Sequence, residues 1–161
     1  MKRNYSVLAL LGLVLICFSA CKAPATEKVD LEKLKPQIQA MEDAFAAGEK
    51  AKNVDSVVAY YADDAVSHNR NEPPSVGMAA IREKIAKGFA KDTAGEYNEY
   101  KVMDLFAEGN SAVEIGSWIR KNANDEVMDN GYYMSYFQKR DGKYKCVRDM
   151  SVTETPVKPV Q

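Results

Sequence analysis

The spacing of apolar residues predicts helices in the first part of the chain. Apolar side chains recur at intervals of four, three and four after a capping Asp30, which is typical of one face of an amphipathic helix: Leu34, Ile38, Met41 and Phe45. A short second helix is predicted to end near Tyr61 and to run into a short strand over 62–66. Beyond the loop around Pro73 and Pro74, a third helix is predicted over about 78–90.

From Glu96 onward, alternation of apolar and polar residues replaces the helical period. It predicts four strands: Glu96–Ala107, Ser111–Lys121, Asp129–Arg140 and Lys143–Thr155. Tight-turn signals between them indicate consecutive antiparallel pairing, and Gly116 inside a long strand indicates a curved sheet. Helices followed by antiparallel strands predict one α+β domain over 31–155, with a cavity between the helices and the sheet that suits a small ligand.

The first twenty residues have the pattern of an export signal. Lys2 and Arg3 precede an apolar run that ends at Phe18 and is short for a membrane-spanning helix. The run leads into Ser19-Ala20-Cys21, which resembles the bacterial lipobox, where the cysteine is acylated. We therefore expect a signal peptide over 1–20, lipid on Cys21, a flexible tether over 21–30 and a lipid-anchored protein in the bacterial cell envelope. An ordinary secretory signal cut near Ala20 is the alternative.

Composition excludes several classes of function but does not identify one. The chain has 161 residues and a net charge of −1, enough for one domain and without the basic excess of a nucleic-acid-binding protein. Loss of Lys2 and Arg3 would leave 20 basic against 23 acidic residues. One histidine and three cysteines argue against a zinc site, and no metal or cofactor is expected. Cys146 is predicted to be a core residue, and residues 156–161 a disordered tail.

Three segments resemble the nuclear transport factor 2-like superfamily, in its SnoaL-like branch: Val54–Val66, Gly77–Arg82 and Asp141–Asp149. The resemblance covers about 31–155 and implies a cone-shaped fold with three N-terminal helices packed on a strongly curved antiparallel sheet. It also implies a pocket between helices and sheet, and often a homodimer formed through the outer sheet face. Members of the superfamily catalyse steroid isomerisation, dehydration or cyclisation, while many others only bind ligands or partners.

The steroid-isomerase members supply a test of catalysis. Their chemistry needs a carboxylate base, together with a tyrosine and a protonated acid that hold the enolate oxygen. By the resemblance these positions fall on Asn69, near Phe45 and near Ser135, none of which can perform the required role. The chain is therefore not expected to be a steroid isomerase, and we lean towards a non-catalytic domain.

Strand alternation predicts which side chains line the cavity. If Asn69 and Ser135 face inward, the wall includes Tyr61, Asn69, Ser117, Tyr133, Ser135, Phe137, Val147 and Asp149. The opposite rows, which include Glu114, Trp118 and Cys146, are rich in aromatic residues and predict an outer face covered by a second copy of the chain.

Two functions stay open. The first is a non-catalytic, lipid-anchored domain that binds a small apolar molecule or a partner in the cavity. The second is an isomerase, dehydratase or cyclase acting on a small carbonyl compound through Asp149, whose carboxyl lies on an apolar wall. His68 is a weaker candidate base, and both residues also fit structural roles at a strand end or at the cavity rim.

Overall fold

The computed structural model describes residues 28–92 and 95–156. The predicted signal peptide, Cys21 and most of the predicted tether and tail lie outside these residues. Three helices are present: α2 (Leu31–Lys50), α3 (Val54–Val58) and α4 (Gly77–Lys91). As predicted, Asp30 caps α2, accepting a hydrogen bond from the backbone N–H of Lys33 at 3.3 Å. No helix in the described ranges is both long and apolar enough to cross a membrane.

Six strands form one curled sheet in the order β2-β1-β6-β5-β4-β3. The strands are β1 (Tyr61–His68), β2 (Ser75–Val76), β3 (Tyr97–Glu108), β4 (Ser111–Lys121), β5 (Val127–Arg140) and β6 (Lys143–Thr153). The four long strands pair antiparallel in sequence order, as predicted. The sheet is mostly antiparallel, and β1 alone among the described strands runs parallel to its neighbour β6, a pairing that the sequence analysis did not address. The two strands are distant in sequence, and alternation within a strand carries no information about the direction of such a neighbour.

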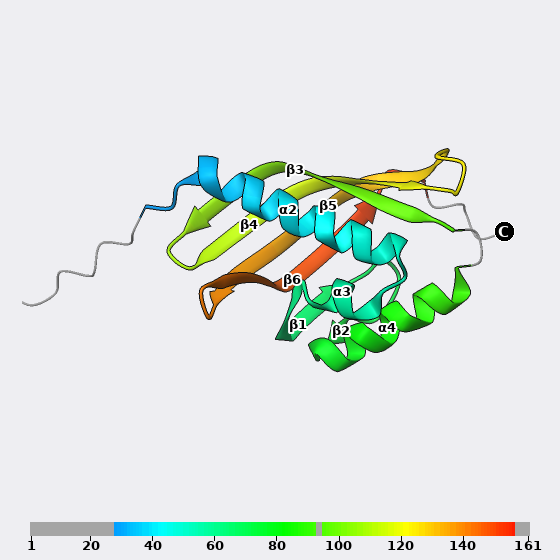
Figure 1. Ribbon diagram of the computed structural model, residues 1–161, viewed down its shortest axis with the longest axis horizontal. Coiled ribbons are helices and arrows are strands. Elements are labelled where there is room, and N and C mark those ends of the chain that lie inside the picture. Colours follow the sequence, from blue (N-terminus) through cyan, green and yellow to red (C-terminus); the bar gives the residue numbers. More distant parts are fainter. Residues whose placement is uncertain (1–27, 93–94, 157–161) are drawn as a thin grey trace, which may run out of the picture.

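The helices lie over one face of the sheet. Figure 1 shows α2 crossing the long strands, with α3 and α4 beside β1 and β2. The core between these layers contains Leu34 and Ile38 of α2, Tyr60 and Tyr61, and Phe137 of β5. Burial of each large apolar side chain contributes roughly 1.5–3 kcal/mol to stability. No described helix covers the opposite, outer face.

The predicted inward row of β5 is confirmed, because Tyr133, Ser135 and Phe137 are all buried. The predicted row of β4 is wrong. Glu114 is 0% exposed and pairs with inward-facing Ser135, so Glu114, Gly116 and Trp118 face the helices while Val113, Ile115, Ser117 and Ile119 face outward. The alternation of apolar and polar residues gave the wrong inward row because the apolar residues of β4 lie on the outer face. Gly116 belongs to the inner row because the Tyr133 ring lies where its side chain would stand.

The row of β6 changes sides within the strand. A register shift lets Tyr136 pair with Arg148 while Phe137 pairs with Cys146, which is typical of a β-bulge that includes Val147. Cys146 is therefore on the inner face and 0% exposed. Its prediction as a core residue is confirmed, and its place in the outer row is wrong. Strict alternation fails here because a bulge adds one residue to the period.

Candidate ligand-binding cavity

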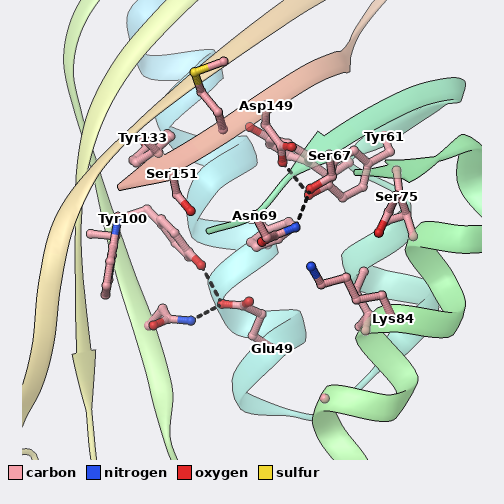
Figure 2. A pocket seen from close by; sticks show the side chains of 18 of the residues that line it. Glu49, Tyr61, Ser67, Asn69, Ser75, Lys84, Tyr100, Tyr133, Asp149 and Ser151 are labelled. Carbon is pink, nitrogen blue, oxygen red and sulfur yellow. Dashed lines mark hydrogen bonds between the residues drawn. The ribbon is translucent and has the colours of Figure 1, made fainter. Parts of the chain in front are cut away.

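A cavity of about 410 Å³ lies between the helices and the inner face of the sheet. This volume lies within the range of small-molecule sites. Figure 2 shows side chains converging on it from α2, α4 and strands β1, β3, β5 and β6. Seven aromatic residues supply much of the lining: Phe45, Tyr60, Tyr61, Phe89, Tyr100, Trp118 and Tyr133. Several of their rings meet edge to face, with centroids 5.6 Å apart for Phe45 and Tyr100 and for Tyr100 and Tyr133.

Asp149 forms a polar cluster with residues of β1. The Tyr61 hydroxyl donates a hydrogen bond to Asp149 Oδ2 at 2.7 Å, and Asn69 Nδ2 donates to Ser67 Oγ at 3.2 Å (Figure 2). Asp149 Oδ1 is buried and has no hydrogen-bond partner in the described part of the chain. Burial raises the pKa of Asp149, and the Tyr61 hydroxyl partly offsets this effect. Ser67 and the His68 backbone also lower this pKa, so Asp149 is a cavity-lining carboxyl group whose Oδ1 is enclosed by protein.

A second cluster lies at the inner end of the cavity and contains Glu42 and Glu114. Glu42 is 2% exposed and accepts a hydrogen bond from the Tyr60 hydroxyl at 2.5 Å. Glu114 accepts one from the Tyr133 hydroxyl at 2.5 Å, while its Oε2 has no partner among the described residues. Burial, reinforced by the charge of Glu114, raises the pKa of Glu42 to about 9. Glu42 is therefore protonated at neutral pH and can donate a hydrogen bond to the neighbouring Glu114 carboxyl group.

Glu49 adds a third carboxyl group to the lining. It accepts hydrogen bonds from Asn98 Nδ2 at 3.0 Å and from the Tyr100 hydroxyl at 2.9 Å (Figure 2). Burial raises the pKa of Glu49 as well. Its hydrogen-bond donors, like the donors to Asp149 Oδ2 and Glu42, are uncharged hydroxyl or amide groups.

The basic residues that line the cavity have acidic partners. Lys84 forms an ion pair with Glu72, whose side chain is half-exposed. Arg120 lies 3.2 Å from Asp129 and 3.5 Å from Glu96. Neither Glu72, Asp129 nor Glu96 lines the cavity. The charge of Lys52, which pairs with Asp92, lowers the pKa of Glu49, and no ion pair among the described residues involves Asp149.

The structure brings together only part of the predicted wall. Tyr61, Asn69, Tyr133 and Asp149 line the cavity, and His68 lies at its mouth with an exposed side chain. The other four predicted wall residues do not line it. Ser135 and Phe137 are buried beneath the wall, Val147 is buried at the bulge, and Ser117 faces outward because the row of β4 is reversed.

The sequence analysis missed the glutamates. Glu42 and Glu49 follow Ile38 at helical positions i+4 and i+11, with Phe45 at i+7. They therefore lie on the apolar stripe of α2 that faces the sheet. A glutamate within an otherwise apolar helix stripe is the sequence feature that could have identified both residues as part of the site. Glu114 gave no comparable signal, because the alternation of β4 placed it on the outer face.

No three histidine, cysteine, aspartate or glutamate side chains within 28–92 and 95–156 are arranged to hold a metal ion. The steroid-isomerase positions can also be located. Phe45 and Asn69 line the cavity, while Ser135 lies beneath it and Tyr60 lies 3.0 Å from its Oγ. The tyrosine and carboxyl groups of this cavity thus come from other positions.

Comparison with known proteins gives the fold family. The sequence model of the SnoaL-like domain family matches residues 38–147 of this chain. A search of curated proteins gives no match. A protein of unknown function with a cystatin-like fold from Nostoc punctiforme superposes with a TM-score of 0.68 at 15% identity, over 80% of this chain and 95% of that one.

Two further solved structures are similar. A ketosteroid isomerase-like protein from Erwinia carotovora has a TM-score of 0.62 at 18% identity, over 76% of this chain and 97% of its own. A nuclear transport factor 2-like protein of unknown function from Shewanella oneidensis has a TM-score of 0.61 at 12% identity, over 72% and 98%. At such identities the likeness shows the fold alone.

Proposed function

The chain belongs to the SnoaL-like domain family, and we propose that it binds a small amphipathic molecule in its cavity without transforming it, as a lipid-anchored domain of the bacterial cell envelope. The proposal rests on the cavity itself, which is lined by aromatic rings and by the carboxyl groups of Glu49 and Asp149. A hydrogen bond from a ligand to a charged carboxylate contributes about 1.5–3 kcal/mol. The aromatic rings would hold the apolar part of the molecule.

Purification of the protein from its native host, followed by native mass spectrometry, tests this function. We expect a small molecule to travel with the folded chain and to be lost from the Asp149→Asn variant. Asp104→Asn is the matched control, because Asp104 is exposed on β3. Ligand-free wild-type protein, with no molecule retained from a native extract, would overturn the proposal.

The lipid anchor is proposed from the lipobox-like segment that ends at Cys21. The mature chain should begin at Cys21 and carry diacyl or triacyl mass. Cys21→Ser should release the protein from the membrane fraction, while Cys17→Ser should not. An unmodified N-terminus at another residue would refute the anchor.

A homodimer through the outer sheet face is part of the same proposal. Large apolar side chains from β3 to β6 are at least one-third exposed there: Phe106, Ile119, Tyr132, Met134, Met150 and Val152. Exposed apolar surface on this scale usually marks an interaction site. A second copy of the same face would bury these side chains around a two-fold axis.

A proton-transfer enzyme is the second candidate, favoured by the raised pKa of Asp149 beside the Tyr61 hydroxyl. In that case the Asp149 carboxylate would remove a proton from the carbon next to a carbonyl group. The test is hydrogen–deuterium exchange into 2-tetralone in heavy water, followed by NMR. Exchange by wild type and none by Asp149→Asn would favour the enzyme, whereas no exchange by wild type would remove it.

A further inference from the structure

We propose that the molecule held in the cavity is an organic cation, a protonated amine or quaternary ammonium group on an apolar body. The inference rests on the proposed binding function and defines the chemical class of its ligand. It follows from the charges inside the cavity, from the rings that surround them, and from the pairing of the basic residues around it.

Three carboxyl groups lie among the polar side chains of the cavity. Glu42, Glu49 and Asp149 line it from α2 and β6, and Glu114 lies directly behind Glu42 and Tyr133 on the inner row of β4. Their hydrogen bonds come from neutral hydroxyl and amide groups. A carboxylate in a buried site is stable only with a cation or several donors close by.

Two oxygen atoms in this region make no hydrogen bond within the described ranges. Asp149 Oδ1 is one, and Oε2 of Glu114, a residue that is 0% exposed, is the other. Both oxygens can only accept hydrogen bonds when their carboxyl groups are ionised. Both atoms are buried beyond the reach of a ligand donor, but the charge of their carboxylates acts across the adjoining cavity, where it favours a cation and repels an anion.

The aromatic lining fits the same class of ligand. Phe45, Tyr60 and Tyr61 pack with centroids 5.0–6.2 Å apart, and Tyr100 and Tyr133 continue the wall. Ring faces attract cations electrostatically, by about 0.5–2 kcal/mol for each contact. Aromatic rings that alternate with carboxyl groups are the usual surroundings of a bound ammonium group.

The basic residues at the edge of the cavity do not provide the missing charge. Lys84 and Arg120 are held by Glu72, Glu96 and Asp129. His68 is exposed at the mouth. Within the described residues neither Glu49 nor Asp149 forms an ion pair, although the charge of Lys52 acts on Glu49, so a cationic ligand would complete the pairing.

Calorimetry with three probes of the same size tests the ligand class. The probes are 2-phenylethylamine (cationic), 2-phenylethanol (neutral) and phenylacetate (anionic). We expect the amine to bind at least tenfold more tightly than the alcohol, and phenylacetate to bind most weakly. Glu49→Gln and Asp149→Asn should each weaken the amine at least fivefold and change the alcohol less than twofold.

Glu99→Gln is the matched control, because Glu99 is exposed on β3 and forms an ion pair with Lys121 outside the cavity. Thermal melting shows whether each variant is folded, and Glu49→Gln carries the test if Asp149→Asn is not. Equal or tighter binding of the alcohol or of phenylacetate would overturn the cationic class and leave the proposed binding function intact. Absence of binding by all three probes would also overturn it, while co-purification from the native host judges the binding function separately.

Discussion

The two faces of the sheet distribute polar and apolar side chains in opposite senses. The inner face, covered by helices, buries Glu114 and Ser135 and carries Asp149. The outer face, which no described helix covers, exposes Phe106 and Met134 by 60% and 43%. In an ordinary two-layer domain the sheet buries its apolar side and exposes its polar side.

This difference separates two kinds of function. Buried carboxyl groups do not improve a core, so their presence on the inner face indicates a site that handles a polar or charged molecule. Exposed apolar residues do not improve solubility, so their presence on the outer face supports the proposal that a second copy of the chain covers it. In our proposal the inner face binds the ligand and the outer face mediates assembly.

The largest expected effect is the difference in unfolding free energy between a phenylalanine-to-alanine substitution on the inner face and one on the outer face. Phe137→Ala removes a ring that is 0% exposed and should lower the free energy of unfolding by about 4 kcal/mol. Phe106→Ala removes one that is 60% exposed and should change it by less than about 0.5 kcal/mol in dilute, monomeric protein. Urea unfolding measures both. Similar losses for the two variants would mean that the outer face contributes to the monomer's core.

A second effect, which depends on pH, is expected when the ionisable carboxyl group of Glu42 is replaced by an amide. Burial raises the pKa of Glu42 from 4.5 to about 9, so the folded state binds the proton more tightly than the unfolded state. The stability from this group is present below about pH 4.5 and is lost as pH rises towards 9. Glu42→Gln should therefore stabilise the protein at pH 8 and have almost no effect at pH 4.

Urea unfolding across this pH range measures the difference. Glu32→Gln, an exposed site on the same helix, is the control and should give a flat difference. A constant difference for Glu42→Gln, equal at pH 4 and pH 8, would show that Glu42 is not protonated in the folded state.

The smallest expected effect concerns the outer face. Met134→Glu places a charge in the exposed apolar patch and should raise the dimer dissociation constant more than tenfold, about 1.4 kcal/mol. Analytical ultracentrifugation measures it, and Asn124→Glu in the turn between β4 and β5 is the control. Wild-type protein that stays monomeric at high concentration would contradict an assembly role for this face.

Local patterns were sufficient for most of the fold. The helical stripe of Leu34 and Ile38 and the alternation after Glu96 predicted the long elements to within about two residues at each end. The resemblance of three short segments gave the family, which the comparison confirms. The site was predicted less well, because Glu42, Glu49 and Glu114 carry no motif.

The sequence by itself determined the α+β class, the helix stripe and the order of the long strands, because these depend on interactions between residues close along the chain. Only the tertiary structure decided that β1 lies parallel to β6, that Glu114 is buried and Val113 is not, and that a bulge at Val147 turns Cys146 inward. Alternation defines two rows in each strand and does not say which row the helices cover. That choice depends on contacts between residues that are not neighbours in sequence. The Tyr133 ring lies over Gly116, and the Tyr133 hydroxyl donates a hydrogen bond to Glu114.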